Sequence, residues 1–146
     1  SINENSKTKF QDFVKTGTPV LGICLGMEMF FEKSEEGIEK GFNVIDGEIV
    51  VLPSTVKVPH MGWNNLEIKR PGVILEGVKD DSWVYFVHSY RAQPKFDEVI
   101  TAESDYGVKI PAVVEKNNFF GTQFHPEKSG DVGKIMIQNF LSVCKK

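Results

Sequence analysis

Cysteine and histidine are scarce in this chain of 146 residues, which has two cysteines and three histidines. Two cysteines are too few for a disulfide framework, and no Cys/His cluster has the spacing of zinc ligands. We therefore expect a reducing, cytoplasmic setting, with no metal and no cofactor. In that setting a lone cysteine has to be judged as a candidate nucleophile.

Long apolar runs and blocks of basic residues are also missing. The longest apolar stretch, Pro19 to Cys24, is far shorter than the ~20 residues of a membrane-spanning helix. Lys and Arg number 17 against 20 Asp and Glu, so the net charge is −3, and no Lys/Arg block indicates binding to nucleic acid or to a membrane surface. An apolar share of 40% is typical of a globular domain, and we expect one domain over residues 1–146.

The hydrophobic pattern predicts an α/β fold. Pro19–Cys24 is typical of a buried strand, and helix formers follow from Leu25 to Glu32. The spacing of Phe10, Phe13 and Val14 predicts a helix that ends at Gly17. Further strands are expected at 48–52, 63–68, 82–87, 99–102, 110–115 and 119–124, the last two joined by a turn at 116–118. A closing helix from Gly130 or Asp131 should bury Val132, Ile135, Met136, Phe140 and Val143.

A Gly-x-Cys-x-Gly pattern, Gly22 to Gly26, lies where the first strand gives way to a helix. A tight turn there would strain the backbone of Cys24, and the flanking glycines would avoid side-chain clashes. The helix N-terminus would lower the pKa of the thiol, and the Leu25 N–H would face an oxyanion on an attacked carbonyl. A small buried cysteine fits the same pattern equally well.

The segment His125-Pro126-Glu127 favours the reactive interpretation. A cysteine nucleophile needs an imidazole base, and the imidazole needs a carboxylate to hold its tautomer. Taken singly, His125 would be a loop histidine and Glu127 a solvated charge. Together with Cys24 they supply the three roles.

Four segments resemble one family. Pro19–Met27 and Gly121–Gly130 are similar to the nucleophile and His–Glu motifs of class I (triad) glutamine amidotransferases. Pro59–Asn64 (Pro-His-Met-Gly-Trp-Asn) and Tyr85–Tyr90 (Tyr-Phe-Val-His-Ser-Tyr) narrow the resemblance to the glutaminase subunits of imidazole glycerol phosphate synthase, an enzyme of histidine biosynthesis. The likeness begins near Thr18 and implies a flavodoxin-like, three-layer α/β domain with a mixed sheet.

The resemblance implies a role for each matching position. Cys24 would attack the side-chain amide of glutamine, His125 would move the protons and Glu127 would orient His125. The glutamine pocket and oxyanion site would include Leu25, Gly26, Glu28, His88, Ser89 and Tyr90. The interface of a heterodimer with the cyclase subunit, which is a (β/α)8 barrel that receives the ammonia, would include Met61, Trp63, Asn64, Tyr85 and Lys128. Taken alone, Trp63 and Tyr85 would be ordinary core or sheet residues, Lys128 a solvated charge and His60 a structural histidine.

Two departures from the family stand out. Glu28 occupies a position where the family usually has glutamine, and an ionised carboxylate there would oppose a Cys24 thiolate and accept but not donate hydrogen bonds. We expect weakened glutaminase activity rather than its loss. The strands, helix and Pro-Gly-rich oxyanion loop that family members carry before the nucleophile strand have no counterpart in these residues. We expect that the sequence is part of a longer protein and that it would not fold stably alone.

Three alternatives remain open. The first is the glutaminase subunit of another class I amidotransferase, such as that of anthranilate synthase, which the 59–64 segment disfavours. The second is a non-catalytic interaction module that keeps the fold and the barrel-binding face, in which Glu28 and the missing N-terminal elements disable the chemistry. The third, a general cysteine-dependent α/β hydrolase, is disfavoured by the His125–Gly130 segment.

Overall fold

The computed structural model describes residues 9, 12–13, 15–34 and 41–145. Its elements are β1 (Val20–Ile23), α2 (Leu25–Glu28), β2 (Phe31–Ser34), β3 (Ile45–Val51), β4 (His60–Asn65), β5 (Glu67–Ile68), β6 (Trp83–His88), β7 (Tyr90–Pro94), η1 (Asp97–Val99), β8 (Ile100–Asp105), β9 (Lys109–Lys116), β10 (Phe119–Thr122), η2 (Pro126–Lys128) and α3 (Gly130–Cys144). Strands dominate the second half of the chain, as the alternating pattern predicts.

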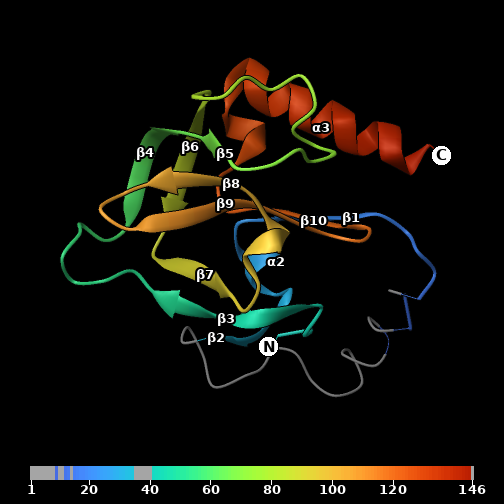
Figure 1. Ribbon diagram of the computed structural model, residues 1–146, viewed down its shortest axis with the longest axis horizontal. Coiled ribbons are helices and arrows are strands. Elements are labelled where there is room, and N and C mark those ends of the chain that lie inside the picture. Colours follow the sequence, from blue (N-terminus) through green and yellow to red (C-terminus); the bar gives the residue numbers. More distant parts are fainter. Residues whose placement is uncertain (1–8, 10–11, 14, 35–40, 146) are drawn as a thin grey trace.

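The central sheet has the strand order β1-β10-β9-β8-β5 (Figure 1). Strands β1 and β10 run parallel, whereas the other neighbours are antiparallel, so the sheet is mixed. The predicted hairpin joins β9 to β10, and Asn117 in its turn has a φ of 55°, a left-handed conformation that asparagine tolerates well.

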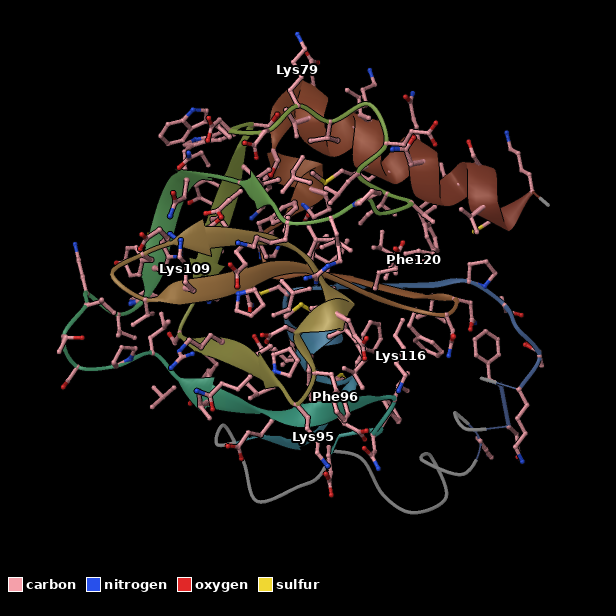
Figure 2. All side chains as sticks on the ribbon, in the orientation of Figure 1. Lys79, Lys95, Phe96, Lys109, Lys116 and Phe120 are labelled. Atoms are coloured by element: carbon pink, nitrogen blue, oxygen red, sulfur yellow. The ribbon has the colours of Figure 1, made fainter. Side chains whose placement is uncertain are left out.

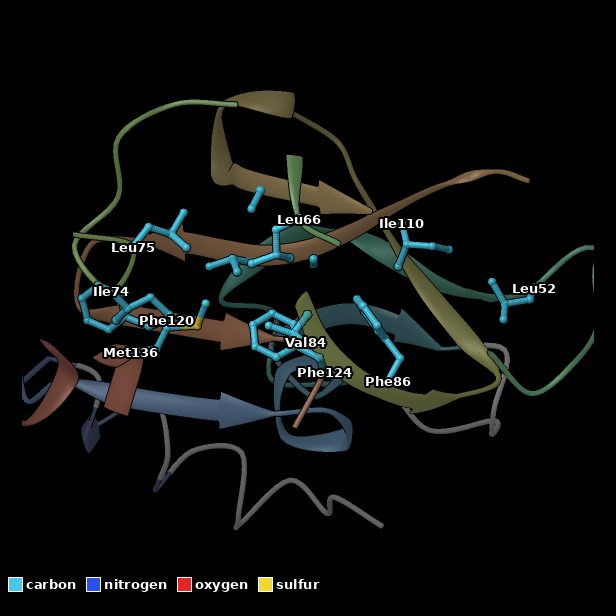
Figure 3. Close-up of a cluster of buried hydrophobic side chains, with 13 residues drawn as sticks. Leu52, Leu66, Ile74, Leu75, Val84, Phe86, Ile110, Phe120, Phe124 and Met136 are labelled. Carbon is cyan, nitrogen blue, oxygen red and sulfur yellow. The ribbon is translucent and has the colours of Figure 1, made fainter. Parts of the chain in front are cut away.

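Both faces of the central sheet are covered, which the neighbouring residues Phe119 and Phe120 make visible. Side chains alternate along a strand, so Phe119 packs in a cluster with residues of the β2-β3-β7 sheet. Phe120 packs in the other cluster, beneath α3 (Figures 2 and 3). The Phe120 and Phe140 rings meet edge to face, with centroids 5.9 Å apart. Helix, central sheet and second sheet form the expected three-layer α/β fold (Figure 1).

Helix α3 presents the predicted apolar stripe to the sheet. Met136 is buried, Val132, Phe140 and Val143 pack against the same cluster, and Ile135 is half-buried. Among the described residues, no helix is both long and apolar enough to cross a membrane.

Three local expectations need correction or stay untested. The helix after Cys24 ends at Glu28 rather than Glu32, because Phe31 starts a strand that pairs with β3 and buries its ring. Strand β1 is only half-buried, since β10 is its one partner among the described residues. Phe10 and Val14, on which the first predicted helix rests, lie outside the described residues, and the expectation about preceding strands remains a prediction.

Candidate active site

Cys24 occupies a strained turn between β1 and α2. Its φ of 55° and ψ of −106° lie in a region that L-residues rarely adopt, as the strand–turn–helix pattern predicts. Gly22 is required here, because a Cβ on it would lie 2.7 Å from the backbone carbon of Gly26. A Cβ on Gly26 would meet nothing within 4 Å, so the clash argument holds for Gly22 alone.

The thiol of Cys24 is close to two groups on other segments. It lies 3.7 Å from the Val87 carbonyl oxygen, to which it donates, and 3.9 Å from the side-chain amide nitrogen of Gln123. Burial raises the pKa of the Cys24 thiol, and the nearby Glu28 carboxylate raises it further, while hydrogen bonds from Leu25 N–H and Gln123 act in the opposite direction. The short helix does not produce the lowered pKa that the sequence pattern predicts, because burial and Glu28 outweigh it.

His125 and Glu127 form a hydrogen-bonded pair at the same edge of the sheet. Because β1 and β10 are parallel, the segments that follow them leave the sheet side by side, and Cys24 N–H donates to Thr122 O at 2.7 Å. His125 Nδ1 lies 2.9 Å from a carboxylate oxygen of Glu127, in the arrangement of an oriented imidazole. The Glu127 carboxylate is near enough to raise the Cys24 pKa. The thiol and the imidazole, both described, share no hydrogen bond.

The His125 backbone is held from two sides. His125 N–H donates to Tyr85 O of β6 at 2.9 Å, and the Ser129 hydroxyl donates to His125 O at 2.6 Å. Pro126 begins η2 and keeps His125 extended, with a φ of −100°. These contacts tie the imidazole-bearing segment to the strand that carries Tyr85.

Glu28 and Gln123 form a buried pair, of which the sequence pattern predicted only Glu28 as a site residue. Glu28 is 7% exposed and Gln123 is fully buried, and the Gln123 amide nitrogen donates to Glu28 Oε2 at 3.1 Å. Gln123 was not a candidate residue, although its place immediately before Phe124 and His125 was a usable signal. Its amide oxygen has no hydrogen-bond partner in the described part of the chain.

Three of the residues expected at the glutamine pocket, His88, Ser89 and Tyr90, form the corner between β6 and β7. Ser89 and Tyr90 are half-buried, whereas the His88 ring is 5% exposed and turns inward to His60. The side chain of His88 is therefore directed into the interior of the domain.

An apolar face is formed by alternate residues of β4 and β6. Cross-strand neighbours on it are Met61 with Val87 and Trp63 with Tyr85, and the Trp63 and Tyr85 rings meet edge to face at 5.9 Å. Met61 is 63% and Trp63 53% exposed. Trp83, two residues before Tyr85 on β6, lies on the same face and is 56% exposed. The sequence pattern did not predict it as an interface residue.

Two further expected interface residues lie apart from this face. Asn64 is turned the other way, where its amide nitrogen donates to Asp105 O at 3.0 Å. Lys128 is exposed on η2, one residue before Ser129, whose hydroxyl accepts from Tyr85 N–H. Among the described residues, no group of three His, Cys, Asp or Glu is placed to hold a metal ion.

Comparison with known proteins places the chain in a family. The family described as "Glutamine amidotransferase class-I" matches residues 3–144. The chain belongs to the class-I glutamine amidotransferases. It is 49% identical over 130 residues to the imidazole glycerol phosphate synthase subunit HisH of Archaeoglobus fulgidus, covering 88% of this chain and 66% of that protein. It is 46% identical over 151 residues to the subunit of the same name in Geobacillus kaustophilus, covering 98% and 71%.

Solved structures show the same fold at low sequence identity. A putative GMP synthase subunit from Thermoplasma acidophilum has a TM-score of 0.68 at 19% identity, covering 97% of this chain and 65% of that one. A glutamine amidotransferase from Thermotoga maritima has a TM-score of 0.65 at 17% identity, covering 97% and 55%. The chain spans about two thirds of the length of the Archaeoglobus relative.

Proposed function

We propose that this chain is part of the glutaminase subunit of imidazole glycerol phosphate synthase. In this proposal it hydrolyses glutamine through Cys24, His125 and Glu127. The observation that carries the proposal is that a strained cysteine lies at the same edge of the sheet as a hydrogen-bonded His125–Glu127 pair, whose Nδ1 and carboxylate oxygen are 2.9 Å apart. The relatives named HisH, at 45–49% identity, support the choice of this synthase.

The proposed reaction uses each group in turn. The thiol proton passes to His125, and the sulfur attacks the side-chain amide carbon of glutamine, with Leu25 N–H placed beside the developing oxyanion. His125 returns the proton to the leaving nitrogen, which departs as ammonia and leaves a thioester. His125 then activates water, which releases glutamate and restores the thiol. Because the imidazole and thiol share no hydrogen bond, bound glutamine has to complete their alignment.

The glutamine pocket is proposed to lie between the nucleophile turn and the β6–β7 corner. A Cβ on Gly26 would meet nothing within 4 Å, and Ser89 and Tyr90 are half-buried at the corner whose Val87 carbonyl contacts the Cys24 thiol. Glu28 would contribute a buried carboxylate close to the thiol.

The apolar face of β4 and β6 is the proposed docking surface for the cyclase barrel. Exposed aromatic and methionine side chains are the residues that dominate protein interfaces. Tyr85 is part of this face, and its carbonyl also holds His125, so the docking surface adjoins the catalytic pair. Ammonia could then pass to the barrel without entering water, where it would be protonated and lose its nucleophilicity. Lys128 is proposed to lie at the rim of this surface. Asn64 is proposed to support it from behind, because its amide donates to Asp105 O. The proposed assembly is a heterodimer in the cytoplasm.

The test is glutamine hydrolysis by the full-length subunit with and without a cyclase barrel carrying its nucleotide ligand. We expect hydrolysis to increase with the barrel and to disappear in Cys24→Ala. Labelling of Cys24 by a reactive glutamine analogue separates an enzyme from a non-catalytic module of the same fold. Stimulation by an anthranilate synthase partner in place of the barrel would favour the other class I enzyme.

A further inference from the structure

Two buried histidines meet across strands β4 and β6. His60 and His88 are register partners, 3% and 5% exposed, and His60 Nδ1 lies 2.9 Å from His88 Nε2. The His60 ring also stacks on Phe86 and Tyr106, with centroids 4.5 and 3.8 Å apart. These contacts hold the ring in one orientation.

The hydrogen bonds determine which nitrogen of each ring carries a proton. His88 Nδ1 is 2.6 Å from Tyr90 O, and a carbonyl can only accept, so this nitrogen carries the hydrogen. In a neutral ring His88 Nε2 is then bare and accepts from His60 Nδ1–H. His60 Nε2 is left bare in turn and accepts from the Asn64 amide at 3.4 Å.

Both rings are neutral at physiological pH. Burial is the main cause that lowers the pKa of His60 and that of His88 to about 4. His88 lowers the pKa of His60 further, and His125 lowers that of His88, while the hydrogen bond to Tyr90 O acts on His88 in the opposite direction. A second proton on His88 would face the His60 N–H. If His60 carried its proton on Nε2 instead, the Asn64 amide would have to flip so that its oxygen accepted that proton. The flip would break the hydrogen bond from the Asn64 amide nitrogen to Asp105 O.

The hydrogen bond from His88 Nδ1 to Tyr90 O lies within the corner of residues 87–90, beside Cys24. The bond from His88 to Tyr90 O spans Ser89, whose own carbonyl accepts from Leu52 N–H at 2.9 Å. Val87, on the other side of His88, gives the carbonyl that the Cys24 thiol contacts. The histidine pair therefore links β4 to the corner that borders the thiol.

We propose that His60 and His88 form a neutral relay that positions the 87–90 corner for glutamine, acting as positioning residues and not as proton donors in the reaction. This inference rests on the proposed function, because it takes the 87–90 corner as part of the glutamine pocket. The relay should affect the KM for glutamine more than kcat, because it touches neither the scissile amide nor His125.

A matched pair of variants of the full-length subunit tests the relay. The amide nitrogen of asparagine reaches about the place of a histidine Nδ1, and that of glutamine about the place of Nε2. His60→Asn keeps a donor toward His88, whereas His60→Gln removes it. Since loss of a buried hydrogen bond costs on the order of a fivefold to tenfold change in an equilibrium, we expect His60→Gln to raise the glutamine KM by about that factor. His60→Asn should restore most of this loss, with kcat within about twofold in both.

The tautomers provide a readout that is independent of glutaminase activity. In protein with 15N-labelled histidine, the His88 ring should show a protonated Nδ1 and a bare Nε2 at pH 7. His60→Asn should keep this pattern and His60→Gln should lose it. A wild-type His88 with its proton on Nε2, or equal KM values in the two variants, would overturn the relay. Failure of the proposed function would instead appear as absent glutamine hydrolysis in wild type, with the NMR pattern intact.

Discussion

The carboxylate of Glu28 accepts a hydrogen bond from the side-chain amide of Gln123 at 3.1 Å, inside the domain and near the Cys24 thiol. The same amide nitrogen lies 3.9 Å from Cys24 Sγ. One donor therefore serves both a carboxylate and a thiol, and a thiolate would add a second negative charge to a buried site that already holds one. This arrangement leads to the first two predictions.

Glu28→Gln should make Cys24 more reactive. The substitution removes the carboxylate that raises the thiol pKa, while its amide oxygen can still accept from Gln123, so the thiolate fraction at pH 7 increases. We expect alkylation by iodoacetamide and the kcat/KM for glutamine each to rise severalfold. Glu67→Gln, an exposed position on β5, is the matched control. Unchanged kinetics in Glu28→Gln would contradict a charge effect of Glu28 on the thiol.

Gln123→Leu should have the opposite effect on the thiol. It removes a hydrogen bond that lowers the Cys24 pKa and deprives Glu28 of this donor. Alkylation of Cys24 should therefore need a higher pH, and the free energy of unfolding should fall by about 1–3 kcal/mol in urea denaturation. Gln93→Leu, at an exposed position of β7, controls for loss of a glutamine. An alkylation profile identical to wild type would show that the 3.9 Å contact has no effect on the thiol.

Trp63→Ala should weaken docking of the cyclase barrel. Trp63 is 53% exposed and pairs with Tyr85, so its loss removes contact area from the proposed surface and little from the core. Central interface aromatics contribute about 2 kcal/mol or more, which corresponds to roughly a 30-fold increase in Kd. Phe96→Ala, on an equally exposed ring of another surface, should leave Kd unchanged in calorimetric titration. Equal effects of the two substitutions would place the interface elsewhere.

Stability should decrease as the pH falls from 6.5 toward 5. His60 and His88 have folded pKa values of about 4, below the usual 6.5, so the unfolded chain binds more protons in this window and acid favours unfolding. The slope is up to about 1.4 kcal/mol per pH unit for each histidine. Urea denaturation at pH 7, 6 and 5 measures it, and His60→Asn should reduce the slope. A constant free energy of unfolding over this range would show that the pair is not held neutral.

Local features of the site could be predicted from the chain itself. Cys24 in its strained turn and extended His125 before Pro126 depend on neighbouring residues, whose backbone preferences are visible in the sequence. The hairpin at Asn117 and the apolar stripe of α3 are local in the same sense. The length of the helix after Cys24 was predicted wrongly, because pairing of Phe31 with β3 overrides helix propensity.

The amino-acid order by itself determined which chemical groups are present and where the backbone turns to expose them. Only the tertiary structure decided which of them touch. Parallel pairing of β1 and β10 brings Gln123 to Cys24 across 99 positions of chain, and the β4–β6 register directs His88 onto His60 and away from the proposed glutamine pocket. Such encounters depend on strand register and on the burial of entire faces, and no short stretch of residues encodes either.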